Sequence, residues 1–231
     1  MGISYNTVSP VFIEVLKNNM LALSGKEESG KTNFIKYMIH AMQTKISDID
    51  IFIFDNYKKK LSSLKGMNVT YEIGAEQCKD VLLNFDFYLQ NKYQRLIAGD
   101  DIGDDWKVLV LNDEDLFTSI SNDKALLAIF KNIVGKYKML NVFVILGGIP
   151  NAQVVYGAPE IYKMVKESRN ILFFDDLENC KLVDVSLSII RQNRKKVEVG
   201  DAFYILGNDC YKIKTPLAVK WFRYDCISNY I

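Results

Sequence analysis

Eight residues near the N-terminus combine glycine, lysine and threonine at a spacing that binds phosphate. Residues 24–32 read SGKEESGKT and contain Gly-x-x-x-x-Gly-Lys-Thr. In such a loop the backbone N–H groups and the following helix N-terminus face the phosphates, the lysine supplies a positive charge, and the threonine hydroxyl binds Mg²⁺. We therefore expect a nucleoside triphosphate to bind at Gly25, Ser29, Gly30, Lys31, Thr32 and Asn33, with Thr32 also on the metal.

The middle of this loop carries two carboxylates, Glu27 and Glu28, where the triphosphate would lie. Unless its side chain turns to solvent, each opposes the phosphates by about 0.5 to 1 kcal/mol at separations of roughly 6 to 8 Å in a largely aqueous medium. Together they are expected to weaken binding several-fold to tens of fold. The prediction is a loop with intact geometry and reduced affinity.

A second segment, residues 107–117, has the sequence KVLVLNDEDLF, in which acidic residues follow an apolar run. Hydrolysis requires a carboxylate there to hold hydrated Mg²⁺ and another to activate water. If the metal-side position directly follows the apolar run, it is Asn112, with Asp113 next to it. If the strand includes Asn112, the metal-side residue is Asp113 and the base is Glu114. An exposed acidic turn before a helix explains the same residues without catalysis.

A third strand in such sheets usually ends with a polar side chain that senses the γ-phosphate. Here the run VFVILGGIP ends in Gly147 and Gly148. Neither residue can form a hydrogen bond through a side chain. We therefore expect the sensing step to be missing.

The elements that must position these residues follow from the apolar pattern. Runs with almost no polar interruption predict strands buried on both faces, as in a parallel sheet covered by helices. These runs are residues 20–24, 51–55, 108–112, 142–146 and 171–175, with helices expected after residue 32 and near 76–97, 124–137 and 159–166. A turn at residues 207–209 within the segment 201–214 predicts an antiparallel hairpin near the C-terminus.

Composition limits the function classes. The 231 residues are 49% hydrophobic, with no repeat or linker, so we expect one domain over residues 1–231. A net charge of +1 provides no overall field for DNA or an anionic membrane. The four cysteines lack a C-x-x-C pair, which predicts reduced, mostly buried thiols rather than a zinc or redox site. The sequence has no run of about 18 apolar residues, so a soluble chain is expected, although a membrane-anchored parent stays open.

Together these motifs resemble the FtsK/SpoIIIE family of RecA-like ATPases, especially the last ATPase domain of EssC-type coupling proteins of type VII (ESX) secretion. The resemblance covers nearly the whole chain and includes the stretches SPVFIEVLKNNMLALSGKEESGKTNFIKYM, VLVLNDEDLF, VFVILGGIP and GDAFYILGNDCYKIKTP. It implies a RecA-like P-loop α/β fold with a mainly parallel central sheet. It also implies ATP and Mg²⁺ as cofactors, bound weakly or not at all.

The resemblance further implies roles for individual residues. By the resemblance, the phosphates would be bound by Gly25, Gly30, Lys31 and Thr32. The metal-binding aspartate of the family would fall on Asn112, because the spacing to Asp115 fits that register better, and Asp113 would be the neighbouring acid. No counterpart of the polar sensor exists. The resemblance therefore predicts weak or absent hydrolysis.

The same resemblance implies partners and a location. Tandem ATPase domains of one parent chain, assembled as hexamers on the cytosolic face of the membrane, would engage small helical-hairpin secretion substrates. A DNA translocase motor and a nucleotide-free protein-interaction domain remain alternatives, although near-neutral charge disfavours DNA.

Two basic clusters, residues 57–65 and 191–196, fit solvated loops better than DNA contacts. Arg191 or Arg194 could serve as a finger toward a neighbouring subunit. The single histidine, His40, is expected to be structural.

Overall fold

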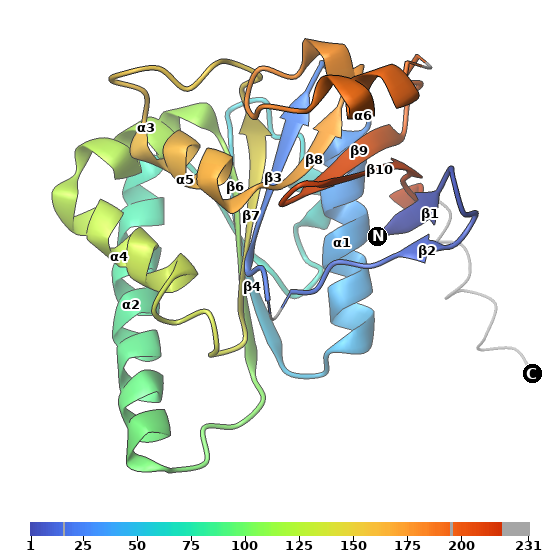
Figure 1. The fold of residues 1–231 in the computed structure, drawn as a ribbon. Helices are drawn as coiled ribbons and strands as arrows, with labels where there is room; N and C mark the ends of the chain where they lie inside the picture. The colour runs from blue at the N-terminus through green and yellow to red at the C-terminus, as the bar shows by residue number, and fades with distance from the viewer. Residues whose placement is uncertain (16, 195, 219–231) are drawn as a thin grey trace, which may run out of the picture.

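The computed structural model describes residues 1–15, 17–194 and 196–218. Ten strands form one sheet in the order β2-β1-β10-β9-β8-β3-β7-β6-β4-β5 (Figure 1). The strands are β1 (Gly2–Ser4), β2 (Pro10–Val11), β3 (Met20–Gly25), β4 (Ile49–Asp55), β5 (Thr70–Ile73), β6 (Trp106–Asn112), β7 (Val142–Ile149), β8 (Asn170–Phe174), β9 (Asp201–Leu206) and β10 (Asp209–Lys214). The helices are α1 (Lys31–Lys45), α2 (Ala75–Ala98), α3 (Glu114–Asn122), α4 (Lys124–Val134), α5 (Glu160–Ser168) and α6 (Leu187–Gln192), with single 3₁₀ turns at Ser62–Leu64 and Leu177–Asn179.

The centre of the sheet is parallel, as predicted. Strands β8, β3, β7, β6, β4 and β5 pair in parallel from neighbour to neighbour. All five predicted strands are present, and β5 is an additional strand at the edge. The largest difference at a strand end is in β7, which continues through the two glycines to Ile149. Because parallel strands share one direction, the loops after β3, β4, β6 and β7 meet at one edge of the sheet.

Helices cover both faces of this sheet (Figure 1). Helix α1 packs on one face, and α2, α3, α4 and α5 pack on the other. The predicted face of α1 is confirmed, since its buried residues are Phe34, Ile35, Met38, Ile39 and Met42. The helix expected to reach residue 137 ends at Val134 instead, because the chain leaves the helix at Gly135.

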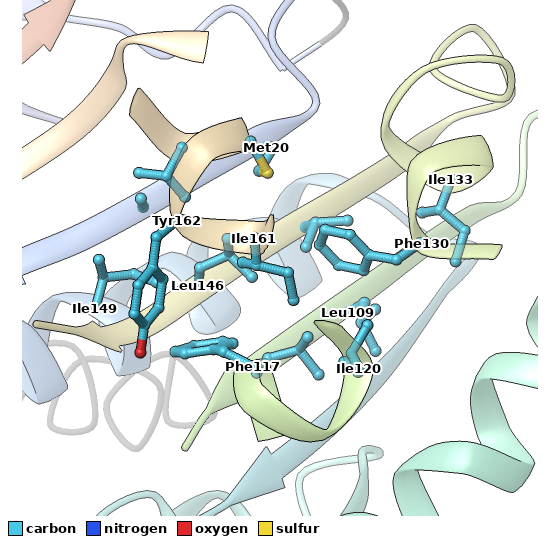
Figure 2. Packing of buried hydrophobic residues seen from close by; sticks show 14 of the residues in the cluster. Met20, Leu109, Phe117, Ile120, Phe130, Ile133, Leu146, Ile149, Ile161 and Tyr162 are labelled. Atoms are coloured by element: carbon cyan, nitrogen blue, oxygen red, sulfur yellow. The ribbon is translucent and has the colours of Figure 1, made fainter. Parts of the chain in front are cut away.

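Successive side chains of the central strands point to opposite faces of the sheet, and both sets are apolar. In β6, Val108 and Val110 pack on the α1 side, whereas Leu109 and Leu111 pack on the opposite side. Figure 2 shows the second side, where residues of α3, α4 and α5 gather over β6 and β7. Phe117 and Tyr162 meet there edge to face, with ring centroids 6.1 Å apart. The two apolar layers hold the sheet rigid beneath its loop edge.

The C-terminal hairpin is confirmed and extends the sheet. Strands β9 and β10 pair antiparallel about a two-residue turn, Gly207-Asn208, and β9 pairs antiparallel with β8. On the far side of β10 the N-terminal strands β1 and β2 continue the antiparallel part, which the apolar pattern did not predict. Short strands with few apolar residues leave little periodic signal.

Within residues 1–15, 17–194 and 196–218, no helix combines the length and the apolar character needed to cross a bilayer. The cysteines of that part, Cys78, Cys180 and Cys210, are free thiols, and only Cys78 is fully buried. Cys226, which the prediction also included, lies outside the described residues. Burial raises the pKa of Cys78 to about 12, which keeps it an unreactive thiol.

Candidate nucleotide site

A cavity of about 930 Å³ lies at the carboxyl edge of the parallel strands. The loops that follow β3, β4, β6 and β7 all line it. The lining includes every residue predicted for the phosphates, namely Gly25, Ser29, Gly30, Lys31, Thr32 and Asn33, together with Asn112, Asp113 and Glu114. The structure therefore brings all the predicted site residues to one place.

Backbone carbonyls of the phosphate-binding loop accept hydrogen bonds from the lysine of the same loop. Lys31 Nζ donates to the carbonyl of Gly25 at 2.7 Å and also to the carbonyl of Lys26. Burial lowers the pKa of Lys31, and the nearby Lys60 lowers it further. Carbonyl oxygens thus hold the ammonium group where phosphate oxygens could replace them. Thr32 follows in the first turn of α1, whose free N–H groups face the cavity.

Glu27 and Glu28 line the cavity, and both are exposed. Glu28 has a φ of 55°, a conformation that lets the chain turn sharply at the top of the loop. Because water reaches both carboxylates, their repulsion of a bound phosphate is screened rather than removed. Their effect on affinity stays a prediction, and it can be measured.

A brace from the C-terminal hairpin supports the loop. The N–H of Gly200 donates to the carbonyl of Ser29 at 3.0 Å, and Thr215 donates its hydroxyl and its N–H to the carbonyl of Gly200, both at 2.8 Å. The amide of Asn33 donates to Pro216 O at 2.9 Å and accepts from Ala218 N at 3.0 Å. The KIKTP stretch therefore anchors the loop. The side chain of Asn33 is engaged in this brace, which leaves its backbone N–H for a phosphate.

The end of β6 includes Asn112 as its last residue. Asn112 is 7% exposed, and its Nδ2 donates to Asp55 Oδ1 at 2.8 Å. Asp113 lies just beyond the strand and caps α3, accepting from Asp115 N at 3.3 Å. Burial raises the pKa of Asp113, the hydrogen bond from Asp115 opposes this, and the Asp115 and Asp55 carboxylates raise it again. Because the strand includes Asn112, the second register applies, with Asp113 as the metal-side residue, whereas the resemblance places that position on Asn112. Both residues line the cavity.

Glu114, the base in the second register, is the first residue of α3. Its Oε1 accepts a hydrogen bond from the hydroxyl of Tyr162 at 3.3 Å. Burial, followed by the charge of Glu114, raises the pKa of Tyr162, so this tyrosine is a stable donor at neutral pH. The contact directs one oxygen of the exposed Glu114 carboxylate toward α5.

Asp55 is a site residue that the sequence reasoning missed. It ends β4 directly beside Asn112 and is fully buried. Its carboxylate accepts from Asn56 N at 3.0 Å, Leu61 N at 2.7 Å and Tyr71 Oη at 2.8 Å, as well as from Asn112. A signal was available, because IFIFD is an apolar run that ends in a carboxylate at the same edge of the sheet.

At the end of β7, the glycine pair occupies the position predicted for the sensor, and Gly147 is buried beside Asn112. A Cβ on Gly147 would lie 2.3 Å from Asn112 Oδ1 and 2.8 Å from Ile35 Cδ1. Gly148 is exposed and lines the cavity. No side chain can enter at residue 147 without moving Asn112.

The first basic cluster is exposed, as expected for a solvated loop, and part of it also lines the cavity. Tyr57, Lys58 and Lys60 line it beside the phosphate-binding loop. Asn56 holds this segment in place, accepting from Lys58 N at 3.0 Å and donating to Asn112 O at 3.2 Å. Among the described residues, neither Lys58 nor Lys60 has a carboxylate within ion-pair distance. Two ammonium groups are therefore available to an anion.

Other predicted residues lie elsewhere. Arg194 lines a separate cavity of about 200 Å³ with Asp176. Arg191, in the last turn of α6, and His40, on α1, do not line the nucleotide cavity. A role for either arginine toward a neighbouring subunit stays a prediction.

The residues present fit a nucleoside triphosphate. The fit rests on Gly25, whose missing Cβ leaves room for tight loop closure, and on the ammonium groups of Lys31, Lys58 and Lys60. The oxygen donors Thr32, Asn112 and Asp113 are of the kind that Mg²⁺ prefers, and all three line the cavity. When bound, the nucleotide and metal would supply the phosphoanhydride chemistry.

A parallel sheet with a phosphate-binding loop between its central strand and α1 defines the fold as that of a RecA-like P-loop ATPase domain. Solved structures share this fold. The pair of ATPases 2 and 3 of EssC from Geobacillus thermodenitrificans matches with a TM-score of 0.78 at 20% identity, over 94% of this chain and 40% of that one. ATPases 2 and 3 of Thermomonospora curvata EccC, in complex with a signal sequence peptide, match with a TM-score of 0.72 at 12% identity over the same shares.

A third match, the pCW3 conjugation coupling protein TcpA in a monomer form with ATPγS, has a TM-score of 0.66 at 14% identity, over 99% of this chain and 69% of that one. This chain thus spans about two fifths of the length of the EssC and EccC chains. Neither a protein-family model nor a curated protein sequence matches it.

Proposed function

We propose that this chain is an ATP-binding domain of a type VII secretion coupling ATPase, with weak or absent hydrolysis, and that it acts in substrate recognition or translocation. One observation carries the proposal. A phosphate-binding loop with its lysine in place shares its cavity with a second strand that ends in Asn112. The family resemblance places the metal-side position on Asn112, and that residue is neutral. We therefore propose nucleotide binding with weak or absent hydrolysis.

The likeness to EssC and EccC domains supports the secretion setting. By this proposal the chain is one of several ATPase domains in a longer, membrane-anchored parent, on the cytosolic side, and the parent assembles as a hexamer. Because the EccC structure holds a signal sequence peptide, we propose that this domain or its neighbours engage small helical-hairpin substrates.

A protein-interaction domain with an empty pocket is the second candidate, favoured by Glu27 and Glu28 on the cavity wall. A DNA motor is supported less. Lys58 and Lys60 line the nucleotide cavity, where they can contact a nucleotide, and the net charge is only +1.

Calorimetric titration of this chain with Mg-ATP, with phosphate release measured in parallel, tests the proposal. We expect saturable binding with a stoichiometry near one and phosphate release close to the protein-free blank. The absence of binding would favour the empty-pocket candidate. Turnover of several ATP per second would contradict the assignment of weak hydrolysis.

Removing the two loop carboxylates is expected to strengthen ATP binding. The double variant Glu27→Gln/Glu28→Gln removes charges that oppose the phosphates by about 0.5 to 1 kcal/mol each, so Kd should fall several-fold to tens of fold at low salt. The gain should shrink as salt is added, because both side chains are exposed. Calorimetry at two salt concentrations measures both effects.

The matched control is Glu167→Gln/Glu178→Gln, which changes net charge equally at exposed positions outside the cavity. An equal gain in the control would show that the effect comes from overall charge and not from the loop.

Neutralising Lys60 is expected to have the opposite effect. Lys60→Gln removes an ammonium group from the cavity wall and should raise the Kd for ATP by roughly two- to fivefold. Lys59→Gln is the control, since Lys59 belongs to the same loop but does not line the cavity. Equal changes in the two variants would contradict a phosphate contact from Lys60.

A further inference from the structure

Three residues at the ends of neighbouring strands form one contact chain, in which Asn112 lines the cavity and the other two are buried beside it. Asp55 ends β4, Asn112 ends β6, and Gly147 lies near the end of β7. Asn112 Nδ2 donates to Asp55 Oδ1 at 2.8 Å. On the other side, Asn112 Oδ1 fills the space that a Cβ on Gly147 would occupy, 2.3 Å away.

We infer that Asp55 is a positioning residue that requires an amide at position 112 and, through it, glycine at position 147. This inference deepens the proposed function and rests on it for its meaning in nucleotide binding. In the register that the resemblance implies, the neutral residue at the metal-side position and the glycine at the sensor position are then two consequences of one buried carboxylate.

The first step is the orientation of the Asn112 amide. Asp55 is buried and already accepts hydrogen bonds from two backbone N–H groups and from Tyr71. Facing it with Asn112 Oδ1 would set two acceptors against each other. The NH₂ group must therefore face Asp55, and Oδ1 must face β7 and the cavity.

The second step is the exclusion of a carboxylate at position 112. Aspartate has the shape of asparagine but no donor, so it would place a second carboxylate about one hydrogen-bond length from Asp55 in a buried setting. Two like charges at that distance are unfavourable, and a shared proton would be needed to relieve them. An aspartate at position 112 is therefore unfavourable beside Asp55.

The third step links Asn112 to Gly147. The contact at 2.3 Å is far shorter than any ordinary approach to a Cβ, and the next atom, Ile35 Cδ1, would lie 2.8 Å away. A polar sensor at position 147 would displace Asn112 Oδ1 and so disturb the amide orientation in which Nδ2 donates to Asp55. Glycine there preserves the hydrogen bond.

A four-member cycle tests the inference: the wild type, Asp55→Asn, Asn112→Asp and the double variant Asp55→Asn/Asn112→Asp. Each single change should lower Tm by roughly 5 to 10 °C, because it sets two acceptors or two donors face to face. The double variant restores an amide opposite a carboxylate and should recover at least half of the summed loss. We expect this recovery to be incomplete. The asparagine at position 55 would have one acceptor oxygen for the backbone N–H groups and the tyrosine hydroxyl, whereas Asp55 accepts these hydrogen bonds with two oxygens.

The second readout is the Mg²⁺ dependence of ATP binding, which a merely structural role would not move. Replacing EDTA with Mg²⁺ should change the Kd of the wild type by less than about threefold. In the double variant, with its carboxylate at position 112, Mg²⁺ should tighten ATP binding about tenfold or more.

Additive losses of Tm in the cycle would overturn the inference, as would equal Mg²⁺ dependence in the wild type and the folded double variant. If the wild type binds no ATP, the proposed function fails, and the Tm cycle alone then decides whether Asp55 positions Asn112. The two failures are thus distinguishable.

Discussion

Replacing Lys31 with alanine is expected to weaken ATP binding by roughly 30- to 150-fold, which corresponds to about 2 to 3 kcal/mol for a charge-assisted contact with phosphate. The lysine is half-buried and is held by the carbonyls of Gly25 and Lys26, at the start of α1. Phosphate oxygens would replace these carbonyls. Calorimetry with Mg-ATP on the variant and the wild type measures the change.

The control for this prediction is Lys45→Ala. Lys45 is the last residue of the same helix and lies outside the cavity, so the variant removes the same charge without a phosphate contact. Thermal unfolding of both variants checks that they are folded. If Lys31→Ala bound ATP as tightly as Lys45→Ala does, the phosphate-binding role of the loop would be wrong.

Replacing Gly25 with alanine is expected to destabilise the fold by about 3 kcal/mol or more. Gly25 has a φ of 122°, and a Cβ there would lie 2.7 Å from the N, C and O atoms of Phe174. Those atoms belong to the backbone of β8, which pairs with β3 at this point. Because these are backbone atoms, they cannot move aside by a side-chain rotation. Strands β3 and β8 must therefore separate where the loop begins. Denaturant unfolding measures the loss.

Gly99→Ala separates the two causes of that loss. Gly99 also has a positive φ, 83°, but a Cβ there would meet nothing within 4 Å. We expect this variant to lose only about 1 kcal/mol, the cost of the backbone conformation alone. A similar loss in both variants would contradict the argument from close approach to β8.

The main parts of the fold were predictable because they depend on local pattern. Uninterrupted apolar runs predicted β3, β4, β6, β7 and β8, and the period of Phe34, Ile35, Met38, Ile39 and Met42 predicted the buried face of α1. The hairpin of β9 and β10 followed from turn residues between two short runs. Strands β1, β2 and β5 were missed, since each is short and lies toward an edge of the sheet, where burial leaves a weak pattern.

The residues of the site also divide into those that a local pattern predicts and those that it does not. Residue type and spacing were enough to identify the phosphate-binding loop, its two glutamates, Asn112 and the glycine pair, because these are local motifs. The three-dimensional structure was needed to show that Asp55 bonds to Asn112 across 57 residues, that Lys58 and Lys60 line the cavity, and that Thr215 braces the loop. Such contacts depend on strand order and register, since neighbouring strands in the sheet are distant in the chain, and no local pattern encodes which strand ends will meet.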